Sequence, residues 1–192
     1  MTLSPNLNNL LTNLDLPKQC TTCKTIYENI KDNFFKVKKH RDGYSYICKK
    51  CKKQKDIKYA RTEIGYLTVC YSTIRNRHNN PRYKNSSEAE KDKHRCYVTK
   101  KEFFELWEEH KKKFGYRCRL TGVKMVLQRA EDAKKRKFTG YSNGMSVDRL
   151  DSTKGYTKDN IIFITNEANK IKSSVTKDMC IRILKLYEEK GL

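Results

Sequence analysis

The chain has 192 residues, enough for one domain or two small ones, and its 43 Lys and Arg residues outnumber 22 Asp and Glu residues, for a net charge of +21. Because such an excess destabilises a compact chain through self-repulsion, it indicates a polyanionic partner, and a membrane-surface role is disfavoured since no long basic amphipathic helix stands out. No run approaches the ~20 apolar residues of a membrane span, and residues 1–16 lack the basic start and apolar core of a secretory signal, so we expect an intracellular protein that is not secreted.

The N-terminal part of the chain is predicted to be a flexible tail, residues 1–16, followed by a zinc ribbon, residues 17–58. Two Cys-x-x-Cys pairs with 24 residues between them can present four thiolates to one tetrahedral zinc ion, which closes the site structurally. A redox Cys-x-x-Cys is the main alternative, and the second pair at this distance argues against it. A β-turn predicted at residues 41–44, after an apolar run, suits a ribbon. The expected zinc ligands are Cys20, Cys23, Cys48 and Cys51.

Basic residues around the second cysteine pair and in the following segment are predicted to contact nucleic-acid phosphates, although a solvated face would show the same charges. A helical pattern runs from about residue 58 to 77 and ends at the breaker cluster 78–81. Residues 82–95 are polar and are predicted to be a loop, so residues 59–95 form a basic helix and linker. The predicted contacts are Lys49, Lys50, Lys52, Lys53, Arg75 and Arg77.

The clearest helix is predicted over residues 99–114. Thr99 and Glu102 fit a capping box, and Gly115 stands where a helix would stop. Within it, Trp107 is expected in the core, and His110 is expected to be structural rather than a catalytic base. Residues 127–140 are charged and poorly periodic, which favours an insert between strands. The remaining cysteines are expected to be buried as small hydrophobic residues: Cys70, Cys96, Cys118 and Cys180.

A short strand, a turn, a second strand and a short helix are predicted after the insert, and a further helix over residues 176–189. Asp148, Asn160 and Asn169 are spaced so that such a hairpin and helix could bring them together. Their oxygen ligands suit Mg²⁺ or Mn²⁺ rather than zinc. In so basic a chain, a site of this kind suggests phosphodiester chemistry on nucleic acid.

The ordered set of residues 116–122, 146–151, 154–161 and 166–172 resembles HNH endonucleases of the ββα-metal class, in the variant common among phage and large-virus proteins. The resemblance covers residues 98–174, and the zinc-ribbon front end is similar to companions of such proteins.

The resemblance implies a role for each matching residue. Asp148 would be the metal-binding carboxylate of the first strand, and Asn169 the second metal ligand, on the helix. Asn160 would hold the loop and so position the neighbouring catalytic residue. One Mg²⁺ or Mn²⁺ ion between Asp148 and Asn169 would stabilise the leaving oxygen of the scissile phosphate as a Lewis acid. Lys170 and Lys172 follow the metal ligand and are predicted to reach nucleic acid.

Arg149 departs from the pattern, because the family carries its general base, a histidine, at this position. A guanidinium stays protonated at neutral pH and cannot accept a proton. Arg149 could clamp the phosphate while Asp151, solvent or a phosphate oxygen takes the proton. A distant histidine could serve instead, or the site could bind without cutting.

We therefore expect an α+β protein with an N-terminal four-cysteine zinc ribbon, connecting helices and a C-terminal ββα-metal domain over residues 96–192. It would hydrolyse phosphodiester bonds of double-stranded DNA, with no small-molecule substrate. The first alternative is a non-catalytic zinc-ribbon DNA-binding protein with a degenerate site. A structural RNA-binding protein is the second. A zinc nucleobase deaminase is disfavoured, because no His-x-Glu accompanies a Pro-Cys-x-x-Cys.

Overall fold

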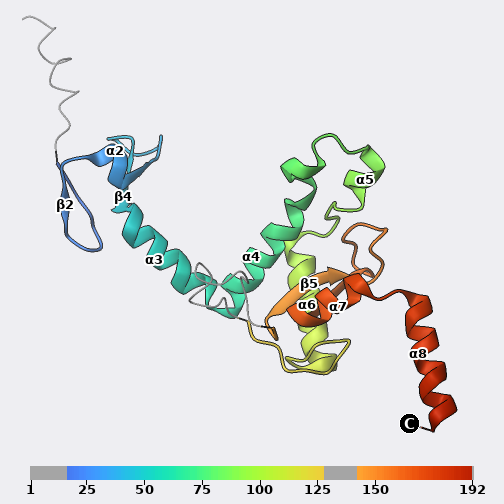
Figure 1. Ribbon diagram of the computed structural model, residues 1–192. Helices are drawn as coiled ribbons and strands as arrows, with labels where there is room; N and C mark the ends of the chain where they lie inside the picture. Colours follow the sequence, from blue (N-terminus) through green and yellow to red (C-terminus); the bar gives the residue numbers. More distant parts are fainter. Residues whose placement is uncertain (1–16, 128–141, 192) are drawn as a thin grey trace, which may run out of the picture. The chain divides into compact units, whose positions relative to one another are not determined.

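The computed structural model describes residues 17–127 and 142–191, and the chain divides into two compact units, Met1–Lys58 and Tyr59–Leu192 (Figure 1). Both units mix helices with small two-stranded sheets, so the α+β class is confirmed. The predicted tail and nearly all of the predicted insert lie outside the described residues. The segment 59–95 belongs to the second unit. Within the described ranges, no helix is long and apolar enough to cross a lipid bilayer.

The first unit contains two antiparallel hairpins, a short helix and most of helix α3 (Lys49–Ala60). Strands β1 (Lys18–Gln19) and β2 (Ile26–Tyr27) form one hairpin, and β3 (Phe34–Lys36) pairs with β4 (Tyr44–Cys48). Helix α2 (Ile30–Asn33) lies between them in sequence. Gly43, at φ +73°, occupies the turn predicted before β4, where a left-handed backbone favours glycine. The core of this unit consists of Phe34 and three of the paired cysteines, Cys20, Cys48 and Cys51.

The helix predicted over residues 58–77 is in fact two helices, which corrects the prediction. Helix α3 (Lys49–Ala60) begins directly after β4, and α4 (Glu63–Arg75) begins after a break. Thr62 causes the break, because its side chain caps α4 by accepting a hydrogen bond from Gly65 N at 3.0 Å. A Cβ atom at Gly65 would lie 1.7 Å from the Tyr59 carbonyl oxygen, so the close approach at this break requires glycine.

The loop predicted over residues 82–95 is also only partly correct. Two short 3₁₀ helices, η2 (Arg77–Asn79) and η3 (Pro81–Tyr83), precede a one-turn helix, α5 (Glu88–Asp92). The Ser87 side chain caps α5 by accepting from Glu90 N at 3.2 Å. A single capped turn leaves no hydrophobic period in the sequence, which is why the pattern favoured a loop.

Helix α6 (Lys100–Phe114) forms the centre of the second unit, and its predicted capping box is present. Trp107 is fully buried, with its ring centroid 5.1 Å from that of Phe163. Its indole N–H donates to Glu63 at the start of α4, at 2.7 Å. His110 is buried beside it and hydrogen-bonds the Arg117 carbonyl oxygen at 2.9 Å through Nε2. The two expectations for these side chains, a core tryptophan and a structural histidine, are therefore met.

A ββα arrangement follows, as the sequence predicts. Strand β5 (Met145–Arg149) pairs antiparallel with β6 (Ile161–Thr165), with Asp148 opposite Ile162. Helix α7 (Asn166–Ser174) begins directly after β6, because the Thr165 side chain caps it by accepting from Ala168 N at 3.1 Å. The hairpin therefore has α7 beside it and α6 packed against Phe163.

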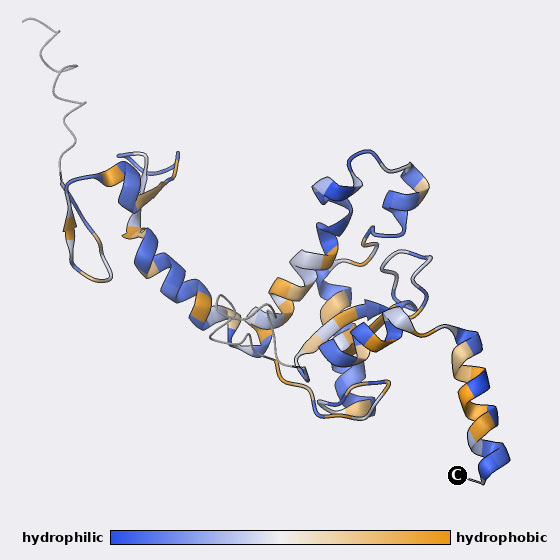
Figure 2. Cartoon of the chain, in the orientation of Figure 1, coloured by the Kyte–Doolittle hydropathy of each residue, from blue (hydrophilic) through white to orange (hydrophobic). Residues whose placement is uncertain are grey.

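The last helix, α8 (Lys177–Lys190), was predicted, and hydrophobic and hydrophilic residues are interleaved along it (Figure 2). Its large apolar side chains are exposed. No residue of α8 is buried against the rest of the described chain. Cys180 on this helix is therefore exposed, contrary to the prediction that it is buried. Of the other lone cysteines, Cys118 is buried as expected, and Cys70 and Cys96 are half-buried.

Candidate metal centres and their surroundings

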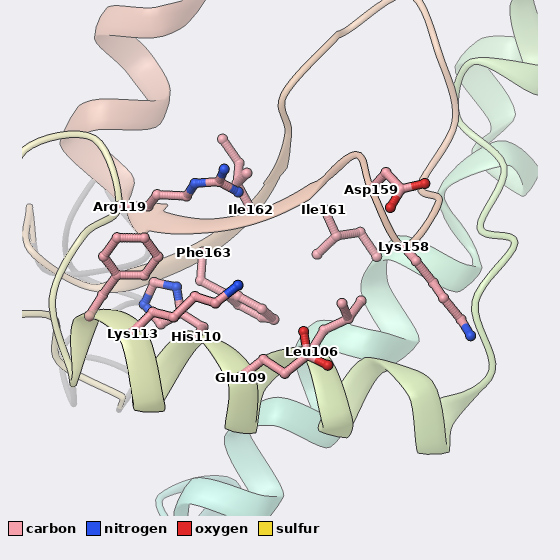
Figure 3. Close-up of a pocket in the computed structure, with 11 residues that line it drawn as sticks. Leu106, Glu109, His110, Lys113, Arg119, Lys158, Asp159, Ile161, Ile162 and Phe163 are labelled. Atoms are coloured by element: carbon pink, nitrogen blue, oxygen red, sulfur yellow. The ribbon is translucent and has the colours of Figure 1, made fainter.

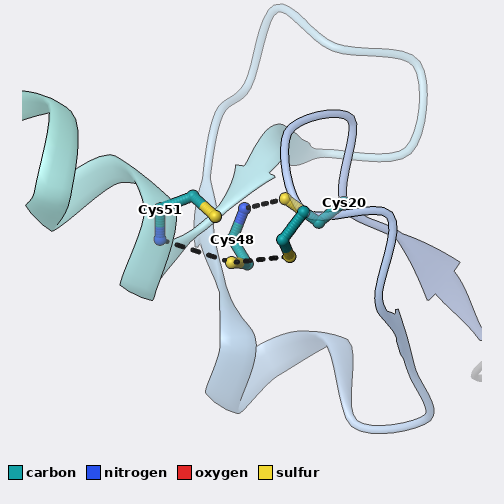
Figure 4. Close-up of side chains that lie close together, drawn as sticks. Cys20, Cys48 and Cys51 are labelled. Carbon is teal, nitrogen blue, oxygen red and sulfur yellow. Dashed lines mark hydrogen bonds between the residues drawn. The ribbon is translucent and has the colours of Figure 1, made fainter.

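The four paired cysteines gather at one point of the first unit (Figure 4). Their sulfur atoms all lie within 4.8 Å of one another, and Cys23 Sγ is 4.0 Å from Cys48 Sγ. Zn–S bonds of about 2.3 Å place the sulfurs of a tetrahedral site about 3.8 Å apart, so the cluster has the size that zinc requires. The arrangement is consistent with a four-cysteine zinc-binding site formed by Cys20, Cys23, Cys48 and Cys51.

The surroundings of Cys20 and Cys23 favour thiolates, whereas those of Cys51 do not. Backbone N–H groups of Thr22 and Cys48 donate to Cys20 Sγ at 3.4 and 3.3 Å, as they do around bound thiolates. Hydrogen bonds from Thr25 lower the pKa of the Cys23 thiol to about 6. Burial raises the pKa of the Cys51 thiol to about 12. A divalent cation supplies the positive charge that would deprotonate a thiol buried in this way.

A second group of polar side chains lies where β5 meets α7. Ser146 and Asp148 are two residues apart on β5 and so share a face of the strand, and Asn169 and Lys172 are three apart on α7. Asn169 Nδ2 donates to Ser146 Oγ at 2.9 Å, and Lys172 Nζ lies 3.1 Å from Asp148 Oδ2. Asp148 and Asn169 therefore lie on neighbouring elements and face the same seam between strand and helix.

The donor types of Asp148 and Asn169 are those that hard divalent cations accept. A carboxylate and an amide oxygen are ligands that Mg²⁺ accepts, and Mg²⁺ commonly keeps several waters beside one or two protein ligands. The Lys172 ammonium group, which also donates to the Arg149 carbonyl oxygen at 2.8 Å, balances the charge of Asp148 in this structure. Lys172 was predicted to contact nucleic acid. In this structure it lies three residues after Asn169 on α7 and pairs with Asp148.

Arg149 points to the opposite side of β5 from Asp148. Its side chain is buried beside Tyr156, with the guanidinium carbon 5.3 Å from the ring centroid. Its Nη1 atom donates to the carbonyl oxygen of Lys93 and, at 3.3 Å, to that of Lys154. Arg149 thus ties the segment after α5 to the loop between β5 and β6.

Asn160 holds the same loop from inside. Its Oδ1 atom accepts from Asp151 N at 2.7 Å, and its Nδ2 atom donates to the carbonyl oxygens of Asp151 at 2.9 Å and Gly155 at 2.8 Å. The φ of Gly155, in this loop, is not positive, and a Cβ atom there would lie 2.7 Å from the Arg95 carbonyl oxygen. Close packing, not turn geometry, requires this glycine.

Two titratable side chains near the loop differ in their capacity to accept a proton. The Asp151 carboxylate accepts from Thr153 N at 2.9 Å and from Thr153 Oγ1 at 2.6 Å, and these hydrogen bonds lower its pKa. Burial lowers the pKa of His94, and the positive charges of Arg149 and Arg77 lower it further. The imidazole of His94 is therefore neutral at pH 7, whereas Asp151 is a weak base.

The basic side chains predicted to contact nucleic acid differ in exposure. Three are half-buried: Lys172, which pairs with Asp148; Arg77, whose Nη1 donates to Tyr156 Oη at 2.6 Å; and Lys49, whose Nζ donates to the Lys31 carbonyl oxygen at 3.0 Å. Five more are exposed on α3, on α4 and on α7; they are Lys50, Lys52, Lys53, Arg75 and Lys170.

A hollow of about 300 Å³ between α6 and β6 is separate from both candidate metal centres (Figure 3). His110 and Phe163 line it together with side chains of both charges, such as Lys158 and Asp159. None of the residues predicted to be catalytic or metal-binding lines this hollow.

Comparisons with protein-family models, with curated proteins and with solved structures found no match for this chain.

Proposed function

We propose that the protein is a metal-dependent DNA endonuclease of the HNH type, with the reaction centre in the second unit. The observation that carries the proposal is the seam between β5 and α7. Asp148 on the strand faces the helix, Asn169 on the helix faces the strand, and Asn160 holds the loop that follows β5. The net charge of +21 supports a polyanionic substrate.

In this proposal Asp148 and Asn169 hold Mg²⁺ or Mn²⁺, which supplies Lewis-acid stabilisation of the phosphate and leaving oxygen. With a cation held there, Asp148 would no longer need the charge of the Lys172 ammonium group, which lies beside the site and would be available to the phosphate. Asn160 keeps the loop between the strands in one conformation, so that Asp148 stays aligned with α7.

Arg149 acts as a positioning residue in the proposed site, because its guanidinium is buried and bonded to two carbonyl groups. The proton from the attacking water then needs another acceptor. Bulk solvent or a phosphate oxygen takes this role, since hydrogen bonds stabilise the Asp151 carboxylate as an anion and His94 lies on the side of β5 to which Arg149 points, away from Asp148. His94 directly follows Lys93, whose carbonyl oxygen accepts from Arg149.

The test is cleavage of supercoiled plasmid with Mg²⁺ or Mn²⁺, comparing the natural chain with Asp148→Ala and with Asp159→Ala as the matched control. Asp159 is an exposed carboxylate in the loop before β6. We expect metal-dependent nicked or linear DNA from the natural chain and the control, and none from Asp148→Ala at equal DNA affinity. Equal cleavage by Asp148→Ala would overturn the assignment of the site.

A non-catalytic DNA-binding protein is the second candidate, and one observation favours it. Lys172 neutralises Asp148, and a buried arginine stands where the family carries its base. Plasmid binding that falls steeply with salt, without conversion in either metal, would select this candidate.

A further inference from the structure

An apolar groove on the surface of the first unit has no role in the proposed reaction. It has a volume of about 530 Å³ and is lined by residues of β3, β4, their flanking segments and the turn between β1 and β2. We call it the aromatic groove; its main lining residues are Phe35, Val37, His40, Tyr46, Ile47 and Lys52. Only Lys52 among them was predicted to contact nucleic acid.

Two aromatic rings of this groove are open to solvent. Phe35 is 49% exposed and Tyr46 is 55% exposed, although this unit has a very small apolar core. Leaving two large rings in water gives up the stabilisation that burial would provide, about 25 cal/mol per Å² of apolar surface. Exposed rings grouped in one apolar groove are typical of a binding surface.

The groove is held in shape by the cysteine knuckle and by ring stacking. The backbone N–H of Thr21, between Cys20 and Cys23, donates to the Tyr46 carbonyl oxygen at 3.0 Å. The His40 ring stacks on the Tyr46 ring, with centroids 4.2 Å apart and planes 16° from parallel. A binding surface that is already ordered loses less conformational entropy when its ligand binds.

Positive charge surrounds the aromatic groove. Lys49 Nζ lies 5.7 Å from the Phe35 ring centroid, and Lys18 Nζ lies 5.5 Å from the Tyr46 ring centroid. Lys52 lines the groove itself, and it pairs with Asp56 in this structure, as Lys18 does with Asp42. Residues 17–58 carry 13 Lys and Arg residues against 4 Asp and Glu residues. The ligand must therefore combine flat apolar faces with negative charge.

We propose that the aromatic groove binds unpaired bases of single-stranded DNA, with the bases stacked on Phe35 and Tyr46 and the phosphates beside the lysines. Aromatic platforms in a cationic groove are the usual means of holding single strands, because every base has a π-face. Duplex bases are stacked on each other and cannot offer those faces. The choice of DNA as the polymer rests on the proposed function, whereas the stacking of bases does not.

The test measures binding of the full-length chain to a labelled oligothymidylate of about 12 nucleotides, a length that covers one aromatic groove of this kind. No Mg²⁺ or Mn²⁺ is added, so binding is read without cleavage. Phe35→Ala and Tyr46→Ala remove one ring each, and Tyr46→Phe keeps the ring. The matched control is Ile26→Ala, which removes a 63% exposed apolar side chain from β2 of the same unit. Zinc content per chain shows that each variant keeps its fold.

We expect each ring-to-alanine variant to lose about tenfold in affinity for the single strand. Duplex affinity should change by less than about twofold, and Tyr46→Phe and Ile26→Ala should bind like the natural chain. An abasic oligonucleotide of the same charge should compete poorly. Unchanged binding by both alanine variants, equal losses on duplex, or equal competition by the abasic strand would overturn the proposal.

The outcomes separate this proposal from the proposed nuclease. Ring-dependent binding without plasmid cleavage would leave the groove assignment standing and remove the endonuclease. Cleavage that depends on Asp148, with binding indifferent to Phe35 and Tyr46, would do the reverse. Preference for an acidic, apolar peptide over the oligonucleotide would replace the proposed partner and so refute it.

Discussion

Replacing Asn160 by Asp or Ala gives the sharpest test of how the loop between β5 and β6 is held. The side chain is buried and makes three short hydrogen bonds, one as acceptor and two as donor. With a net value of about 1 kcal/mol for each hydrogen bond, Asn160→Ala should lower the free energy of unfolding by about 3 kcal/mol.

Asn160→Asp keeps the acceptor for Asp151 N but turns a carboxylate oxygen toward the carbonyl oxygens of Asp151 and Gly155. The native state then favours the protonated acid, which can donate, so the pKa of this carboxyl is raised above its unfolded value. A raised pKa makes the native state bind more protons than the unfolded state. Stability therefore falls as the pH rises from about 4, by about 1.4 kcal/mol per pH unit until the folded pKa is reached.

The assay is urea unfolding at pH 4.5 and pH 7.5, followed by the fluorescence of Trp107. This is the one tryptophan of the sequence and it lies in the core of the second unit, so the signal reports that unit alone. Asn143→Ala is the control, because its amide makes a single longer hydrogen bond, 3.3 Å to the Lys124 carbonyl oxygen. The reasoning is refuted if Asn160→Ala costs less than about 1 kcal/mol. It also fails if the Asp variant is equally stable at both pH values.

Three further predictions use the same unfolding assay or a direct metal measurement. Hydrogen bonds from Lys158 and Thr99 lower the pKa of Glu102 to about 2. The contribution of Glu102 to stability is therefore complete above the unfolded pKa of about 4.3 and should disappear as the pH falls toward 2. Acid unfolding of the natural chain compared with Glu102→Gln checks this. Cys48→Ser should reduce bound zinc, measured per chain, to below one equivalent, while Cys180→Ser on α8 should leave it unchanged. Lys172→Met removes the ammonium group beside Asp148 and should tighten Mn²⁺ binding several-fold by titration calorimetry, whereas weaker binding would show that the lysine supports the cation.

The elements that the sequence predicted well are those that carry a strong local signal. The capping box and apolar spacing marked α6, and the ordered motifs at residues 146–151, 154–161 and 166–172 marked β5, β6 and α7. The two Cys-x-x-Cys pairs marked the cysteine cluster, because the spacing within each pair already directs both sulfurs to one point.

The misses share a physical reason, which is that they depend on contacts between distant segments. The break between α3 and α4 depends on the approach of Gly65 to the Tyr59 carbonyl group, which no periodicity records. The aromatic groove was missed because Phe35 and Tyr46 read as ordinary strand residues, and only the fold shows that both are exposed. Cys180 was expected to be buried because α8 has the apolar period of a buried helix. No part of the described chain covers that helix, so the thiol is exposed.

The Asp-Arg dipeptide at the end of β5 shows how strand alternation bears on the proposed chemistry. Alternation sends Asp148 toward α7 and Arg149 toward the carbonyl groups of Lys93 and Lys154. A histidine at position 149 would be too short to bridge those two carbonyl groups and would leave them without the charged donor. Arg149 therefore joins the segment after α5 to the loop between β5 and β6, and the proposed site depends on this loop to keep Asp148 aligned with α7. Replacing Arg149 by His should consequently slow plasmid cleavage, even though it restores the residue type that the family carries there, and faster cleavage by this variant would show that the arginine weakens the site.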